Sequence, residues 1–85
     1  MKVIEFEKAI FEVEEVVVRV RAAQGVEVGD YDYERKAAHT TSVADWLAGR
    51  VVPCLNGLQV SVIDGTFTSP HGRTKMGTLR SSYER

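Results

Sequence analysis

The sequence TTSVADWL, residues 40–47, predicts the beginning of a helix. With Ser42 as the N-cap, Asp45 occupies the third helical position, a short-chain variant of the capping box. The Asp45 charge also suits the positive end of the helix dipole. Because Pro53 disfavours helical geometry at the residue before it, the helix should end near Arg50–Val52. Apolar residues recur at helical spacing and should face the core: Val43, Trp46, Leu47 and Val51.

Alternating patterns before this helix predict strands. In Val16–Ala22, the even-numbered residues are apolar and two of the three odd-numbered ones are arginines, as in a strand with one buried face. Gln24-Gly25 then predicts a hairpin turn, with residues 26–37 as the second arm, bent at Gly29. The first dozen residues are ambiguous. Val3, Phe6, Ile10 and Val13 match an amphipathic helix, but Ile4–Glu7 also alternates, and we favour a strand over residues 3–14.

A second set of strand signals follows the helix. Asn56-Gly57 predicts a turn, and Leu58–Val62 alternates as a strand. Asp64-Gly65 is the strongest hairpin signal of the chain, with Thr66–Thr68 as a short return arm.

These elements predict an α+β fold, a small antiparallel sheet of four to five strands with a single helix packed on one face. We expect one compact domain over residues 1–69, with residues 70–85 as a loop and basic C-terminal tail of the same domain. Exposed sheet edges in so small a protein invite pairing with a second copy, so we also expect a homodimer formed edge to edge.

Composition narrows the functional classes. The net charge of −1 combines an acidic beginning, nine acids against six bases in residues 1–36, with a tail that holds four bases and one acid after residue 66. Cys54 is the only cysteine, and with His39 and His71 it makes no zinc-binding spacing. The longest strongly apolar run is Val16–Val18, too short for a membrane span or a signal peptide. We therefore expect a cytoplasmic protein with no metal, cofactor or membrane partner.

One segment has the residue types of a metal-dependent nuclease. On a strand, Asp30, Asp32, Glu34 and Lys36 would share one face, and carboxylates with a lysine can hold Mg²⁺ beside an attacking water. Glu34-Arg35-Lys36 resembles the E-x-K pair of restriction-like nucleases, which implies carboxylates contributed by two different strands. Gly29-Asp30 stands too close to this pair for that. We therefore interpret the segment as an amphipathic strand, with Tyr31 and Tyr33 facing inward.

Two groups of residues are candidates for binding. Tyr31, Asp32, Tyr33 and Glu34 combine aromatic rings with acids and suit a basic protein surface. Arg73, Lys75 and Arg80 of the tail could contact a nucleic-acid backbone or an acidic protein.

The sequence contains no catalytic set of residues. It predicts a small non-catalytic protein-binding module, such as an inhibitor or a regulatory accessory protein. A nucleic-acid-binding accessory protein that uses the basic tail is the first alternative, and a small metal-dependent nuclease is the second.

Overall fold

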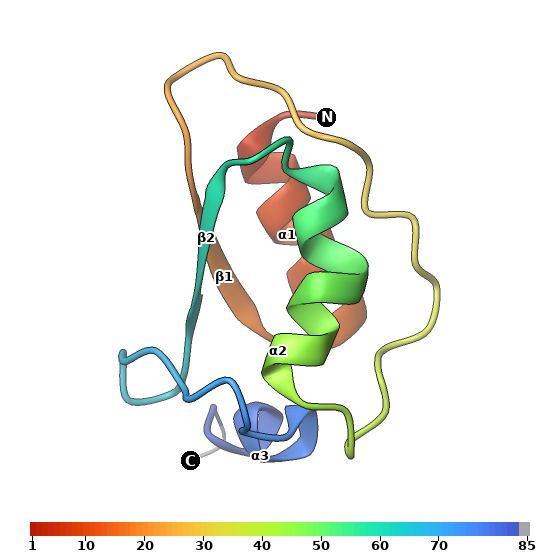
Figure 1. Ribbon diagram of the computed structural model, residues 1–85, viewed down its shortest axis with the longest axis vertical. Helices are drawn as coiled ribbons and strands as arrows, with labels where there is room; N and C mark the ends of the chain where they lie inside the picture. The colour runs from red at the N-terminus through yellow and green to blue at the C-terminus, as the bar shows by residue number, and fades with distance from the viewer. Residues whose placement is uncertain (84–85) are drawn as a thin grey trace.

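The computed structural model describes residues 1–83. Its elements follow in the order α1 (Val3–Glu14), β1 (Val17–Arg21), α2 (Val43–Trp46), η1 (Leu47–Val51), η2 (Val52–Cys54), β2 (Gln59–Ile63) and α3 (Met76–Ser81). Figure 1 shows α1 and α2 on the same side of the sheet, with the long connection between β1 and α2 running along the far side of the helices. The described part of the chain thus has three layers, which are a sheet, a pair of helices and an irregular segment.

The sheet contains only two strands in residues 1–83, so the expectation of four to five strands and a single helix is wrong, although the fold is α+β. β1 and β2 are antiparallel, with Val17 opposite Ile63 and Arg21 opposite Gln59. Three helices accompany them. The missing strands are residues 3–14, which form α1, and the two expected hairpin arms, residues 26–37 and 66–68, which are irregular.

α1 is a helix because its apolar residues follow the helical period over twelve residues, whereas the alternation at Ile4–Glu7 spans only four. Phe6, Ile10 and Glu14 lie on one face and are buried completely. The helix ends at Glu15, which adopts the left-handed conformation (φ 61°) and donates its N–H to the carbonyl of Phe11.

Residues 26–37 contact the beginning of the chain and not β1. Gln24-Gly25 does form a turn, with Gly25 at φ 86°, but no strand follows it. The amide of Val28 donates to the carbonyl of Met1 at 2.9 Å, and the amide of Gly29 donates to the carbonyl of Cys54 at 2.8 Å. Because these contacts hold the segment on the far side of the helices, it does not extend the sheet.

The predicted helix start is confirmed. The Ser42 hydroxyl accepts a hydrogen bond from the amide of Asp45 at 3.1 Å. The helical conformation continues through a π-helical turn to Val51 and a 3-10 turn to Cys54, with Pro53 in the first turn of the latter. Trp46 is buried, as its place on the apolar stripe predicts.

Helix α3 contributes to the core. Met76 and Leu79 of α3 are fully buried against the apolar side chains of the sheet and the other two helices. Full burial of side chains of this size contributes about 1.5–3 kcal/mol each. This part of the expected tail therefore stabilises the fold.

The Asp64-Gly65 turn does not lead into a strand. Asp64 accepts hydrogen bonds from Thr66 and Thr68, which close the loop on itself. Phe67 adopts a left-handed conformation with φ 65°. The expected return arm over residues 66–68 is therefore absent from the structure.

Candidate functional site

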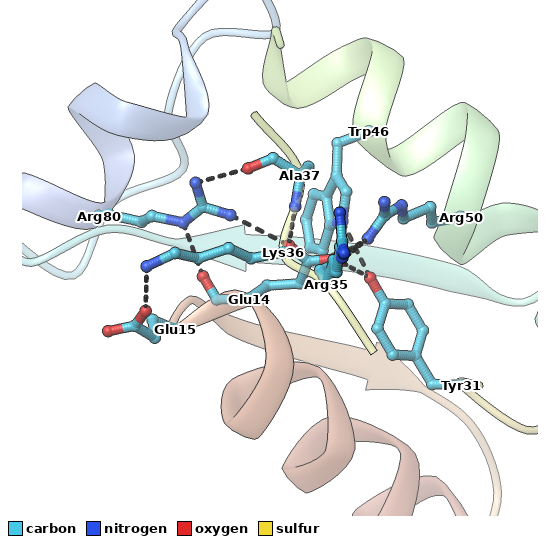
Figure 2. Close-up of polar contacts among 9 residues, drawn as sticks. All are labelled: Glu14, Glu15, Tyr31, Arg35, Lys36, Ala37, Trp46, Arg50 and Arg80. Atoms are coloured by element: carbon cyan, nitrogen blue, oxygen red, sulfur yellow. Dashed lines mark hydrogen bonds and ion pairs between the residues drawn. The ribbon is translucent and has the colours of Figure 1, made fainter. Parts of the chain in front are cut away.

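A buried carboxylate joins the layers of the protein. Glu14, at the end of α1, has no exposed surface, and its carboxylate accepts four hydrogen bonds (Figure 2). The Tyr31 hydroxyl donates one, the backbone amide of Ala37 donates at 2.8 Å, Arg50 donates at 2.8 Å and Arg80 donates at 3.0 Å. These donors come from the long irregular segment, from η1 and from α3. We call Glu14 and these four residues the Glu14 cluster.

Further hydrogen bonds hold the donors of the cluster in place. Arg80 donates through Nε to the carbonyl of Glu14 and through an Nη to the carbonyl of Ala37, both at 2.8 Å. Trp46 donates its ring N–H to the Tyr31 hydroxyl at 3.0 Å. Arg50 also donates to the carbonyl of Arg35, at 2.7 Å. Each donor is thus oriented by a second partner, which makes the arrangement rigid.

The cluster keeps Glu14 ionised. Burial alone would raise the pKa of this carboxyl, but hydrogen bonds from Tyr31, Ala37 and Arg50 outweigh burial and lower its pKa below the usual value. Burial, followed by the neighbouring carboxylate, raises the pKa of the Tyr31 hydroxyl well above 10. Both oxygens of this carboxylate accept hydrogen bonds from the protein, and the residue has no exposed surface. It therefore cannot reach a substrate to exchange a proton with it. We therefore assign the cluster a structural role.

Sequence reasoning missed Glu14, although one signal was available. If residues 3–14 are read as a helix, Glu14 falls four residues after Ile10 and eight after Phe6, on the apolar face. A carboxylate at such a position requires buried donors, and arginines are the side chains that supply them.

The four residues predicted to bind protein differ in exposure, although the rings of Tyr31 and Tyr33 lie together with their centroids 4.9 Å apart. Tyr31 is buried, with its ring edge-on to Phe6. Tyr33 is partly exposed, and the Arg50 guanidinium lies 4.4 Å from its ring centre. Asp32 and Glu34 are exposed on the irregular segment. A binding role for these residues stays a prediction, which now rests on the three that reach the surface.

The residues of the nuclease hypothesis do not share a strand face, because the segment is irregular. Lys36 is paired with Glu15 at 2.6 Å, and Asp30 lies 3.6 Å from the terminal amino group. Among residues 1–83 no group of three or more potential ligands is arranged to hold a metal ion.

Of the three basic residues of the tail, Arg73 and Lys75 line one open groove and Arg80 lies apart from it. Arg80 is occupied by the Glu14 cluster, whereas Arg73 and Lys75 are exposed. The loop that carries them covers the beginning of α2. The carbonyls of Thr74 and Gly72 accept hydrogen bonds from the amides of Val43 and Ala44 at 2.7 and 3.0 Å. The backbone amides that could have bound a phosphate there already have partners.

An exposed apolar surface lies beside β1. One groove, of about 500 Å³, runs between α1 and β1 and is lined by Ile4, Phe11, Val17 and Arg19, among others. A second groove, of about 320 Å³, shares Val17 and Arg19 with the first and continues to Phe67. Ile4 is 73% exposed, Phe11 54% and Phe67 83%, and these are three of the five large hydrophobic residues exposed in residues 1–83. We call the two grooves together the Arg19 surface.

In residues 1–83, no helix has the length and apolar character needed to cross a membrane. No protein-family model, curated protein sequence or solved structure matches the chain.

Proposed function

We propose that the protein is a small non-catalytic protein-binding module, an inhibitor or a regulatory accessory protein, and that it binds its partner through the Arg19 surface. The observation that carries the proposal is the backbone conformation of Phe67 together with the exposure of its side chain. Its backbone is left-handed, a conformation that costs an L-residue roughly 1–2 kcal/mol, and its ring is 83% exposed. Large residues in strained conformations cluster at binding sites.

The neighbours of Phe67 support the proposal. Scattered exposed hydrophobic residues are ordinary, whereas exposed hydrophobic residues that line continuous grooves are typical of interaction sites. Ile4 and Phe11 lie seven residues apart on α1 and line one groove, and Phe67 lines the other. Val17 and Arg19 belong to both, so one partner can contact all three side chains.

The test compares the native chain with Phe67→Asn, since asparagine tolerates left-handed geometry and the change removes the ring without adding strain. Each tagged protein is incubated with lysate of the source cells, with and without nuclease, and bound material is quantified. We expect the native chain to retain a protein in stoichiometric amount, unaffected by nuclease, and Phe67→Asn to lose it.

The matched control is Val52→Asn, because Val52 is 50% exposed but lines neither groove. It should retain the partner as the native chain does. Equal capture by Phe67→Asn would contradict the proposed surface. Loss of the bound material on nuclease treatment would instead favour a nucleic-acid-binding accessory protein, with exposed Arg73 and Lys75 as the contacts.

A further inference from the structure

We infer that the partner of the Arg19 surface is an acidic protein segment, in which a carboxylate that binds Arg19 lies between apolar side chains that occupy the two grooves. The inference rests on the proposed function and specifies the chemistry of the partner. It depends on where Arg19 lies and on which charges surround it.

Arg19 lies on the outer face of the sheet. The odd-numbered residues of β1 and β2 point away from the helices, while Val18 and Val62 are buried beneath them. Arg19 is exposed, and within residues 1–83 the only hydrogen bond that its guanidinium donates is to the carbonyl of the preceding residue, at 3.0 Å. Among residues 1–83 it forms no ion pair, so its fork of donors is available to a carboxylate.

The strand beside Arg19 carries no charge. Arg19 is opposite Ser61 in the register, and the next exposed arginine, Arg21, is opposite Gln59. The outer face of the sheet therefore presents two arginines, each opposite a neutral polar residue. An acidic residue on the facing strand could have paired with either arginine, but β2 contains none.

The carboxylates that line the grooves already have partners. Glu7 accepts the amide of Val20 at 2.7 Å, and Asp64 accepts hydrogen bonds from Thr66 and Thr68. Lys8, the other cation of the first groove, also lacks an ion pair within residues 1–83. Glu7 and Asp64 keep their negative charge, but backbone amides and threonine hydroxyls already donate to them, whereas the donors of Arg19 and Lys8 have no carboxylate partner within residues 1–83. A carboxylate of the partner is the acceptor that complements these two cations.

A single segment fits this surface better than an extended anion does. A membrane or a nucleic-acid backbone would bring negative charge to the whole face, including the carboxylates of Glu7 and Asp64, which line the grooves. A protein segment can place one carboxylate at Arg19 and apolar groups elsewhere. The apolar groups would contact Ile4 and Phe11 on one side of Arg19 and Phe67 on the other.

The inference is tested by selecting displayed random dodecapeptides on the immobilised full chain, after removal of peptides that bind Phe67→Asn. We expect the selected peptides to carry Asp or Glu with large apolar residues on both sides. Replacing that acid by its amide should weaken binding about tenfold, the loss expected for one charged hydrogen bond. Selection on Arg19→Glu should enrich Lys or Arg at the same place, whereas selection on Arg35→Glu, the same charge change outside the grooves, should return the acidic peptides.

Selected peptides that depend on Phe67 but carry no acid, or that bind Arg19→Glu equally, would overturn the inference and leave the proposed function standing. A selection that yields no peptide dependent on Phe67 would count against both. A third outcome is that no acidic peptide is selected, while the chain binds phosphatidylglycerol vesicles and Arg19→Glu abolishes that binding. This outcome would also overturn the inference, because the partner would be a membrane surface and not a protein segment.

Discussion

Arg80 and Glu14 are 66 residues apart in the sequence, and their side chains meet at 3.0 Å in the interior of the protein. The contact connects α3 to α1 and, through Ala37, to the irregular segment between β1 and α2. That segment does not pair with either strand of the sheet. Its position depends on hydrogen bonds to a buried carboxylate, so the Glu14 cluster takes over the role that additional strands would have had.

Replacing Arg80 by methionine should destabilise the protein severely. The change leaves the buried Glu14 carboxylate without one of its two arginine partners and frees two backbone carbonyls, and breaking a buried ion pair costs about 3–5 kcal/mol. This is comparable with the total stability of a small domain. Urea unfolding followed by circular dichroism measures it. Arg73→Met, at an exposed position, should change the free energy of unfolding by less than about 0.5 kcal/mol, and a similar result for Arg80→Met would contradict the assigned role.

Stability should decrease as the pH falls below about 4.5. The pKa of Glu14 is lowered in the folded protein, and that of Asp64 is lowered to about 2 by hydrogen bonds from Thr66 and Thr68. A lowered folded-state pKa stabilises above the unfolded-state pKa, and this stabilisation is lost as pH falls through the folded-state value. The free energy of unfolding should thus be constant near neutral pH and decline from about pH 4.5 toward pH 2. If Glu14→Gln folds, its decline should be shallower than that of the native chain; an unchanged slope would mean that Glu14 does not contribute.

The parts of the fold that could be predicted are those fixed by neighbouring residues. The Ser42 cap, the Asn56-Gly57 turn and the two strands each depend on residues close in sequence, and each forms close to its expected place. α1 is also determined by neighbouring residues, but it was predicted wrongly. The alternation of apolar and acidic residues at Ile4–Glu7 favoured a strand over the helical spacing of the same segment.

The remaining elements depend on residues distant in sequence. Residues 26–37 have a strand-like composition but find no partner strand, and they bind Met1, Cys54 and the Glu14 cluster. Asp64-Gly65 has the composition of a hairpin turn, but the backbone of Ser82 is packed against Gly65. The sequence predicted binding at Tyr33, Arg73 and Lys75, which are exposed but line neither groove, and it did not predict the Arg19 surface. That surface joins α1, β1 and the loop after β2, and its grooves exist only once these are assembled.

Gly65→Ala should destabilise the protein because the new methyl group would clash with the backbone of Ser82. A methyl group on Gly65 would lie 1.7 Å from the carbonyl oxygen of Ser82, and neither segment can move without disturbing the docking of the C-terminal residues. We expect a loss of about 1–3 kcal/mol in thermal unfolding. Gly49→Ala is the matched control. It lies within the helical stretch, where the new methyl would have no atom within 4 Å outside its chain neighbours and the backbone of its own helix, and it should stabilise by about 0.5–1 kcal/mol. Equal melting temperatures for the two variants would contradict the contact between the loop and the C-terminal residues.

Phe67→Asn should leave the isolated protein at least as stable as the native chain, although it removes a large aromatic side chain. The exposed ring gives little packing, and asparagine accepts the left-handed backbone at lower cost, so the free energy of unfolding should rise by up to about 1 kcal/mol. Val52→Asn, where the backbone is helical, should show no such gain, because asparagine is a poor helix former. Urea unfolding of the three proteins at pH 7 measures the difference. A loss of more than about 1 kcal/mol in Phe67→Asn would show that the ring packs within the folded chain, and it would remove the reason to assign Phe67 to a partner.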